Sequence, residues 1–344
     1  MDADLTVTAR GGSPTIYDVA RLAGVSPSTV SRALNRPGRI SPATAAKIRA
    51  AADELDFRAN PMARALLTGR SQTLGMLVAD ITNPMFFEVA RGAERAAAAH
   101  GYTLVIAESQ ESDLREAEAA ERVLPSVDGM ILVTTRLTDA EITRFAQRKP
   151  LVVLNREVAG VQSVVADIMP GVDQALAHLH DLGHRSIAYV SGPARSWMSG
   201  ARQRMLESRA AERGLHMTVI GPGEPSRAGG RAALSKLIAS GATAVVAYND
   251  LMAIGLLQAA QEVDLAVPAA FSIVGFDDIF GADLTTPALT TVRTPLAEMG
   301  ALAVNAILNA ADAPSTSPFP PLETQLVIRR STGPARVRGA HLER

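Results

Sequence analysis

The chain has 344 residues, of which 47% are hydrophobic and 20% charged, a composition ordinary for a globular protein of two or three domains. It contains no cysteine, which excludes disulfides and thiolate metal sites and favours a reducing compartment. No apolar run approaches the roughly 18 residues of a membrane span. The first ten residues, MDADLTVTAR, do not resemble a secretory signal, so we expect a cytoplasmic protein with no membrane partner.

The net charge of −1 conceals an uneven distribution along the chain. Residues 11–70 hold nine Lys or Arg and four Asp or Glu, a net charge of +5, which leaves −6 for the remainder. A basic segment joined to an acidic body is typical of a small module that binds a polyanion.

The basic segment contains four helix starts. Each begins at a residue that can cap a helix, and three of these residues precede a proline, which is common in the first helical turn. The expected caps are Thr15, Ser26, Ser41 and Asn60. The pattern predicts helices over 16–23, 27–34 and 42–55, and a short turn at Gly24 gives the first two the proportions of a helix-turn-helix.

The second of these helices has a composition suited to a DNA major groove. Val30 and Ala33 or Leu34 fall on the inward face, so the polar residues near the N-terminus point outward. Hydroxyl side chains allow close approach and bind phosphates, while an arginine matches the edge of guanine. The outward residues are Pro27, Ser28, Ser31 and Arg32.

The segments TIYDVARLAGVSPSTVSRALN and ANPMARALLTGRSQTLGMLV closely resemble the lactose/galactose repressor (LacI/GalR) family of bacterial transcription factors. The resemblance implies a hinge helix within residues 60–70 that folds when a dimer docks on its operator, with Leu66 inserted into the minor groove. The residues that we expect to contact DNA are Tyr17, Ser26, Pro27, Ser28, Thr29, Ser31, Arg32, Asn35, Arg64 and Leu66. Residues 1–14 are expected to be a disordered leader, and residues 15–59 the DNA-binding domain.

From Leu74 onward, short apolar runs alternate with helical stretches, a rhythm that predicts doubly wound α/β lobes with parallel sheets. The run SVVAD at 163–167 is a natural crossover between lobes. The resemblance implies a two-lobed core, like a periplasmic binding protein, over 71–330. It places lobe one at about 71–166 and 293–318, lobe two at about 167–290 and 319–330, and a flexible tail at 331–344.

Polar residues follow many of these runs, at the strand ends where such folds bind ligands. Carboxylates, amides and hydroxyls suit a polyhydroxylated small molecule, because a sugar hydroxyl both donates and accepts. The resemblance implies effector contacts from Arg204, Asn249 and Asp277, with support from Asn155 and Phe86. Trp197, the only tryptophan, either stacks on a sugar or caps the core of its lobe.

Other classes of protein fit less well. No nucleophile, phosphate-loop, dinucleotide or zinc-protease motif is present, so an enzyme is not expected, and no cofactor is expected. The spacing of His178, His180 and His184 does not suit a metal site, and the adjacent Asp277 and Asp278 point to opposite sides of a strand. A sugar-binding transport receptor shares the body but not the DNA-binding head. The sequence therefore predicts a dimeric repressor that binds a palindromic operator. We expect its effector to be a small molecule, and specifically a sugar, bound in the cleft between the lobes.

Overall fold

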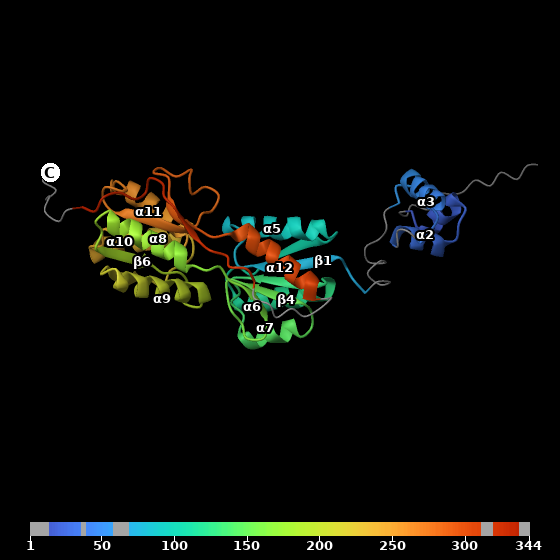
Figure 1. Cartoon of the computed structure of the whole chain (residues 1–344), viewed down its shortest axis with the longest axis horizontal. Helices are drawn as coiled ribbons and strands as arrows, with labels where there is room; N and C mark the ends of the chain where they lie inside the picture. Colours follow the sequence, from blue (N-terminus) through green and yellow to red (C-terminus); the bar gives the residue numbers. More distant parts are fainter. Residues whose placement is uncertain (1–13, 36–38, 58–68, 311–318, 337–344) are drawn as a thin grey trace, which may run out of the picture. The chain divides into compact units, whose positions relative to one another are not determined.

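The computed structural model describes residues 14–35, 39–57, 69–310 and 319–336 (Figure 1). Two compact units, residues 1–71 and 72–344, make up the chain. The expected hinge helix, including Arg64 and Leu66, lies outside the described residues, as does the expected leader up to residue 13.

The first unit is a three-helix head. It contains α1 (Ile16–Ala23), α2 (Pro27–Asn35) and α3 (Pro42–Glu54), so the predicted boundaries are confirmed within one residue. Thr15 and Asp18 form a capping box, and Gly24 ends α1 in the left-handed conformation at φ 66°. The three helices bury one small cluster, made of Val19, Ala20, Val30, Ile48, Ala51 and Ala52.

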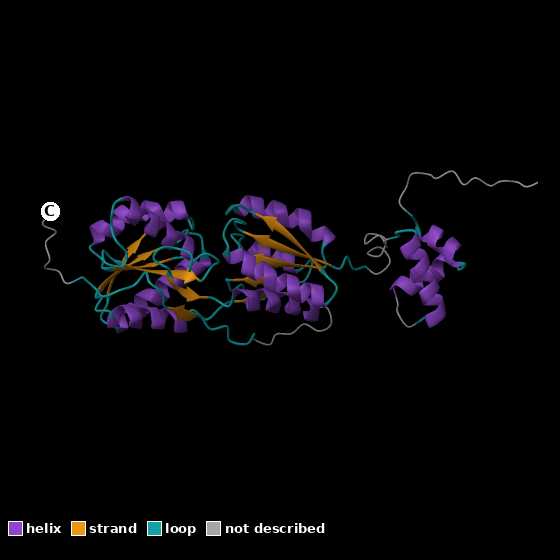
Figure 2. Ribbon diagram, turned by 90° about the horizontal axis from the view of Figure 1, so that it is seen from above, coloured by secondary structure: helices purple, strands orange, loops and turns teal. Residues whose placement is uncertain are grey.

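The second unit begins with a lobe built on a five-stranded parallel sheet of order β2-β1-β3-β4-β5. Helices cover both faces of this sheet (Figure 2). Its elements are β1 (Thr73–Val78), α5 (Met85–Ala99), β2 (Thr103–Glu108), α6 (Asp113–Val123), β3 (Gly129–Val133), α7 (Asp139–Ala146), β4 (Leu151–Leu154), β5 (Gln162–Val164) and α12 (Leu296–Ala310).

The second lobe has a six-stranded sheet of order β11-β10-β9-β8-β6-β7, in which only β11 is antiparallel to its neighbour. The doubly wound parallel core is therefore confirmed. The elements are α8 (Met169–Asp181), β6 (Ser186–Val190), α9 (Trp197–Glu212), β7 (His216–Ile220), α10 (Arg227–Ser240), β8 (Ala244–Ala247), α11 (Asp250–Glu262), β9 (Ser272–Asp277), β10 (Thr290–Arg293) and β11 (Gln325–Val327).

Helix α12 returns the chain to the first lobe, where it packs against α5 through two glycines. A Cβ atom added to Gly92 would lie 1.9 Å from the carbonyl oxygen of Ala297, and one added to Gly300 would lie 2.1 Å from that of Val89. The two backbones therefore approach more closely than any larger residue permits.

The strand pairing locates two of the lobe crossings. Strand β10 pairs with β9 in the second sheet as far as Arg293 and α12 begins at Leu296, so the chain crosses into lobe one at residues 294–295. In the run at 163–167, β5 belongs to the first sheet, because it pairs with β4 before the chain leaves the lobe.

The expected flexible tail is wrong for residues 331–336, which pack on the second lobe. Ser331 is fully buried and donates to the carbonyl of Ile273 at 2.6 Å. His184 lies within hydrogen-bond distance of the Gly333 carbonyl (3.1 Å) and of the Ser272 hydroxyl (3.0 Å), and its other ring nitrogen lies 2.8 Å from the Thr243 hydroxyl. These contacts give His184 a structural role.

We predict that acid destabilises the core through His184. Burial lowers the pKa of His184 below its ordinary value of 6.5, so the unfolded chain takes up the proton more readily than the folded one. The contribution of the neutral ring to stability is therefore complete above about pH 6.5 and is lost as the pH falls below that value. Thermal unfolding from pH 8 to pH 5 measures this, and His184→Gln should flatten the decline. An equal decline in both proteins would contradict the assignment.

Candidate ligand cleft and DNA-binding surface

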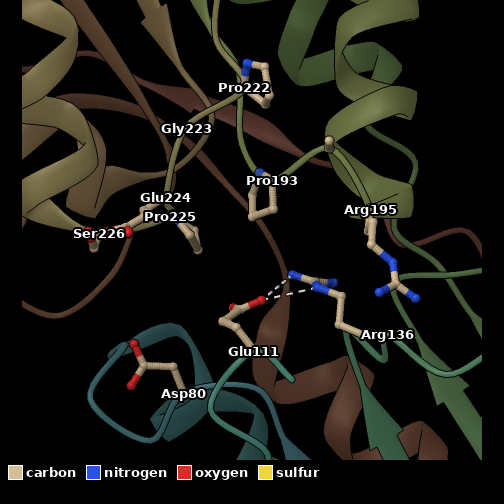
Figure 3. Close-up of a pocket in the computed structure, with 11 residues that line it drawn as sticks. Asp80, Glu111, Arg136, Pro193, Arg195, Pro222, Gly223, Glu224, Pro225 and Ser226 are labelled. Atoms are coloured by element: carbon tan, nitrogen blue, oxygen red, sulfur yellow. Dashed lines mark hydrogen bonds and ion pairs between the residues drawn. The ribbon is translucent and has the colours of Figure 1, made fainter. Parts of the chain in front are cut away.

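A cavity of about 610 Å³ lies between the two lobes, at the carboxyl ends of strands from both sheets (Figure 3). Ligands of doubly wound folds bind at such ends. The first lobe contributes Asp80, Glu111 and Arg136, and the second lobe contributes Pro193, Ala194, Arg195, Pro222, Gly223, Glu224, Pro225 and Ser226.

Arg136 on the first-lobe wall of this cavity is buried, and its guanidinium donates three hydrogen bonds that fix its position. Its Nε and Nη2 donate to one carboxylate oxygen of Glu111 at 3.0 and 2.6 Å, as Figure 3 shows, and its Nη1 donates to the carbonyl of Thr134 at 2.7 Å. The backbone N–H of Arg136 donates to Glu116, whose pKa burial raises. Charge-assisted bonds of this kind fix the orientation of a side chain.

An ion pair joins the lobes beside the cavity. Nη1 of Arg195, in the loop after β6, lies 2.8 Å from a carboxylate oxygen of Asp113, the first residue of α6. Hydrogen bonding from Arg195 lowers the pKa of Asp113. Both side chains are partly exposed, so the pair contributes little to stability.

Arg202 is the buried cation of the second lobe. Its Nη2 donates to Asp277 at 2.8 Å, and its Nη1 donates to the carbonyl of Tyr248. The guanidinium carbon lies 3.7 Å from the ring centre of Phe276 and 5.0 Å from that of Tyr248. The side chains of Arg202 and Asp277 are only 5% and 3% exposed, so each is the main compensation for the other's charge.

Sequence reasoning placed Arg204 and Asp277 together among the effector contacts, whereas in the structure the carboxylate of Asp277 binds Arg202. Residues two apart on a helix differ in direction by about 200°, so the two arginines leave α9 on different faces. The buried positions Met198, Arg202 and Leu206 recur every four residues. That spacing was the sequence signal that could have identified Arg202.

Arg204 and Trp197 instead line a separate groove of about 400 Å³ next to Asp167 and Ile168. Arg204 is exposed, and Trp197 packs against the core of the second lobe. The arrangement of Trp197 matches the alternative in which it caps the core.

The remaining expected effector residues are buried: Asn249, Asn155 and Asp277 lie at strand ends, whereas Phe86 lies in the first turn of α5. The amide of Asn249 caps α11 by accepting from Met252 N–H, and it donates to the carbonyl of Pro225, a residue of the cavity wall. Asn155 follows β4 with φ 61°, and Phe86 lies in the first-lobe core. Asp277 borders a second cavity of about 450 Å³ on the side of the lobe crossings.

The residue after Asn249 anchors this strand end. Asp250 is fully buried and accepts from the Thr291 hydroxyl at 2.5 Å and from Ile279 N–H at 2.8 Å. Burial raises the pKa of Asp250 to about 8. A Cβ on Gly275 would lie 2.0 Å from the Asp250 carboxylate, so this strand position accepts only glycine.

Three buried polar atoms near the strand ends have no hydrogen-bond partner among the described residues: Thr134 Oγ1, Arg202 Nε and Thr294 Oγ1. Leaving a buried polar group unsatisfied costs about 1–3 kcal/mol. Sequence reasoning named neither Thr294 nor Arg202 as an effector residue. Such atoms are suited to bind the hydroxyls of a polar ligand.

In the head, the surface expected to bind DNA is exposed. Tyr17, Ser26, Ser28 and Arg32 are exposed, whereas Pro27, Thr29 and Ser31 are half-buried. The Ser26 hydroxyl accepts from Thr29 N–H at 3.2 Å, and the guanidinium of Arg32 donates from Nε to the carbonyl of Ser28 at 3.2 Å. Asn35 is the last residue of α2.

No helix within the described ranges is long and apolar enough to cross a membrane. The same part of the chain holds no group of three or more His, Asp or Glu residues placed to bind a metal ion. His178 lies 2.9 Å from the hydroxyl of Thr332, a contact within the protein.

A helix-turn-helix in one unit, and a two-lobed α/β core with an interlobe cavity in the other, define the class of ligand-responsive transcription regulators. Residues 15–60 match the bacterial regulatory proteins of the lacI family, and residues 176–332 match the periplasmic binding protein-like domain. The chain belongs to the LacI family of bacterial transcription regulators and is not an enzyme.

Known relatives match over most of their length. The ribose operon repressor of Escherichia coli (strain K12) is 34% identical over 312 residues, which cover 88% of this chain and 94% of that protein. The HTH-type transcriptional regulator GalS of Salmonella typhimurium (strain LT2) is 35% identical over 305 residues, with coverage of 86% and 90%.

Solved structures share the architecture. The lac repressor dimer bound to operator and the anti-inducer ONPF has a TM-score of 0.83 at 26% identity, covering 94% of this chain and 100% of that chain. A LacI family transcriptional regulator from Enterococcus faecium with bound ribose has a TM-score of 0.68 at 29% identity, covering 77% and 100%.

Proposed function

We propose that this LacI-family repressor binds a palindromic operator as a dimer and that an uncharged sugar in the interlobe cleft sets its operator affinity. The observation that carries the proposal is the buried Arg202–Asp277 pair: Asp277 ends β9 and borders the cavity of about 450 Å³, in the same chain as a lacI-type helix-turn-helix. Polar groups fixed by burial orient a ligand without further ordering.

The charges around the cleft favour a neutral ligand. Each of the guanidiniums of Arg136, Arg195 and Arg202 already has a carboxylate partner. Asp80 and Glu224 add two more carboxylates to the cavity wall. A phosphate or carboxylate on the ligand would face this negative charge, and no arginine or lysine among the described residues of the cavity wall lacks a carboxylate partner.

The effector contacts follow from these groups. In our proposal Asp277 accepts from ligand hydroxyls and Arg202 donates to ligand oxygens, while Thr134 and Thr294 offer hydroxyls that have no hydrogen-bond partner among the described residues. Asn249 contributes the amide at the cavity wall. Asn155 and Phe86 remain candidates for supporting contacts, and Trp197 and Arg204 belong to the separate groove.

D-ribose is the first sugar to test. One relative is named the ribose operon repressor, and solved relatives contain bound ribose. One solved relative contains cellobiose and another contains D-xylulofuranose, so a panel of neutral sugars should be screened for the effector.

Exposed apolar side chains support the dimer. Strand β2 is an edge of the first sheet and leaves Val105 and Ile106 more than 40% exposed, and Phe87 on the adjacent helix α5 is 47% exposed. In the second lobe, Phe280 and Leu284 are more than 70% exposed. A second copy of the chain would cover such surfaces, and a two-fold dimer presents two equivalent heads to an inverted repeat.

Two measurements on the purified protein test the proposal. A sugar at 100 times its dissociation constant should add roughly 2.7 kcal/mol to the stability of the core, which a thermal-shift panel of neutral sugars and their phosphates detects. Footprinting on the DNA upstream of the gene should show an inverted repeat whose protection changes with the same sugar. A single unrepeated site, or binding of the sugar phosphates alone, would refute the proposal.

We predict that Arg32 reads a base. Arg32→Ala should cost roughly 1–3 kcal/mol per half-site and relax the preference at one operator position, because a guanidinium matches the edge of guanine. Binding to a library of operator variants measures both effects. If the variant protein weakens equally on every operator without a change in rank order, Arg32 contacts only phosphate.

A further inference from the structure

Strand β9 ends at Asp277, and the next residue, Asp278, faces different partners. Asp277 and Asp278 both have positive φ, 103° and 56°, so the chain turns sharply as it leaves the sheet. Asp277 binds Arg202 in the second lobe. Asp278 has no part in the effector contacts proposed above.

Asp278 is bound by two arginines. One carboxylate oxygen accepts from Nη2 of Arg329 at 2.7 Å, and the other accepts from Nε of Arg293 at 2.7 Å. The side chain is only 8% exposed. A buried carboxylate with one guanidinium on each oxygen is held in a single orientation.

The two arginines lie next to chain crossings between the lobes. Arg293 is the last residue of β10, and α12 of the first lobe begins three residues later. Arg329 comes two residues after β11, the first strand that the chain forms on its return to the second lobe. Asp278 therefore connects β10, which precedes the crossing into the first lobe, to the segment after β11, which follows the crossing back into the second lobe.

The third crossing is tied to the same region through the backbone. Asp167 N–H donates to the carbonyl of Leu322 at 2.9 Å, and Thr324 N–H donates to the carbonyl of Asp167 at 3.0 Å. The carbonyl of Asp277 accepts from Thr294 N–H, in the crossing that follows Arg293. The effector-facing aspartate is thus bonded to the crossing at residues 294–295, and the other two crossings are bonded to each other.

We propose that Asp278 is a positioning residue that fixes the angle between the lobes and transmits cleft occupancy to it. The transmission rests on the function proposed above, whereas the fixing of the angle does not. A ligand that moves Asp277 must move Asp278, its neighbour in the chain, and with it both arginines. The clamp thereby couples the cleft to the relative placement of the lobes.

Asp278→Asn tests the clamp because it keeps the shape of the side chain and removes its charge and one acceptor oxygen. Asp173→Asn is the matched control. Oδ1 of Asp173, on α8, forms ion pairs at 3.2 Å with Nε of Arg209 on α9 and with Nη2 of Arg213, the residue that follows α9. The control therefore removes a carboxylate that also faces two arginines, but that pairs α8 with the end of α9 inside the second lobe and not with a strand next to a crossing.

The chain has no cysteine, so spin labels can be attached at Glu118→Cys on α6 and Glu207→Cys on α9 without other changes. Both positions are exposed, one in each lobe. Pulsed electron resonance on the full chain, without sugar, should show one narrow distance distribution for the parent and for Asp173→Asn, and a broader or shifted one for Asp278→Asn. Three identical distributions would overturn the proposal.

A second measurement adds D-ribose and operator DNA. The dissociation constant of Asp278→Asn for ribose should lie within about threefold of the parent's. The change in operator affinity that ribose causes should be roughly tenfold smaller in Asp278→Asn than in the parent. If ribose changes the operator affinity of both proteins equally, the proposed transmission is wrong. If the parent does not bind ribose, the proposed effector is wrong, and the distances between the spin labels still test the role of Asp278.

If Asp278→Asn fails to fold, Arg293→Gln removes the more exposed of the two arginines that bind Asp278, and it must alter the same distances.

Discussion

Arg202→Ala should abolish sugar binding and lower the free energy of unfolding of the core by about 3–5 kcal/mol. The substitution leaves the carboxylate of Asp277 buried without its main counter-charge, and it opens space between Phe276 and Tyr248. Urea unfolding measures the stability, and titration with the sugar identified by the panel measures binding.

Two further proteins separate binding from stability. Arg204→Ala should change neither quantity appreciably, because Arg204 is exposed in the separate groove. Arg202→Met combined with Asp277→Leu should recover much of the lost stability, since two apolar side chains remove both buried charges, and it should still not bind sugar. Retained binding in Arg202→Ala together with lost binding in Arg204→Ala would show that the effector occupies the groove.

Ile48→Asp should unfold the head and eliminate operator binding while leaving the core intact. Ile48 is fully buried in a cluster of six buried residues, and a head of this size has little stability to spare. A carboxylate placed there would be buried without a partner. Far-ultraviolet circular dichroism, operator binding and sugar-dependent thermal shift on the same protein measure the three effects.

Ile48→Val is the matched control for the head, with an expected cost of about 0.5–1.5 kcal/mol and retained operator binding. The head and the core are separate compact units, so the core should keep its melting temperature and its sugar response in Ile48→Asp. Simultaneous loss of sugar binding would mean that the units fold together.

Elements that depend on local chemistry were predictable from the sequence. The helices of the head begin at Thr15, Ser26 and Ser41, whose side chains bind the free N–H groups of the first turn, and Gly24 ends the first helix because it adopts positive φ without strain. The apolar runs predicted the first nine strands, since strands in the middle of parallel sheets are buried on both faces. Strands β10, TTVR, and β11, QLV, escaped prediction because polar residues leave them no apolar run.

The sequence by itself determined the helix-turn-helix, the doubly wound lobes and the polar strand ends, because capping, hydrophobic runs and turn residues act over a few neighbouring positions. Only the tertiary structure decided that Arg202 and not Arg204 meets Asp277, since the packing of Met198 and Leu206 sets the rotation of α9 on its sheet. It likewise decided that residues 331–336 lie against His184 and that Asp278 joins Arg293 to Arg329. These contacts link positions 15 to 149 residues apart, and no local propensity specifies which distant partner a buried charge will find.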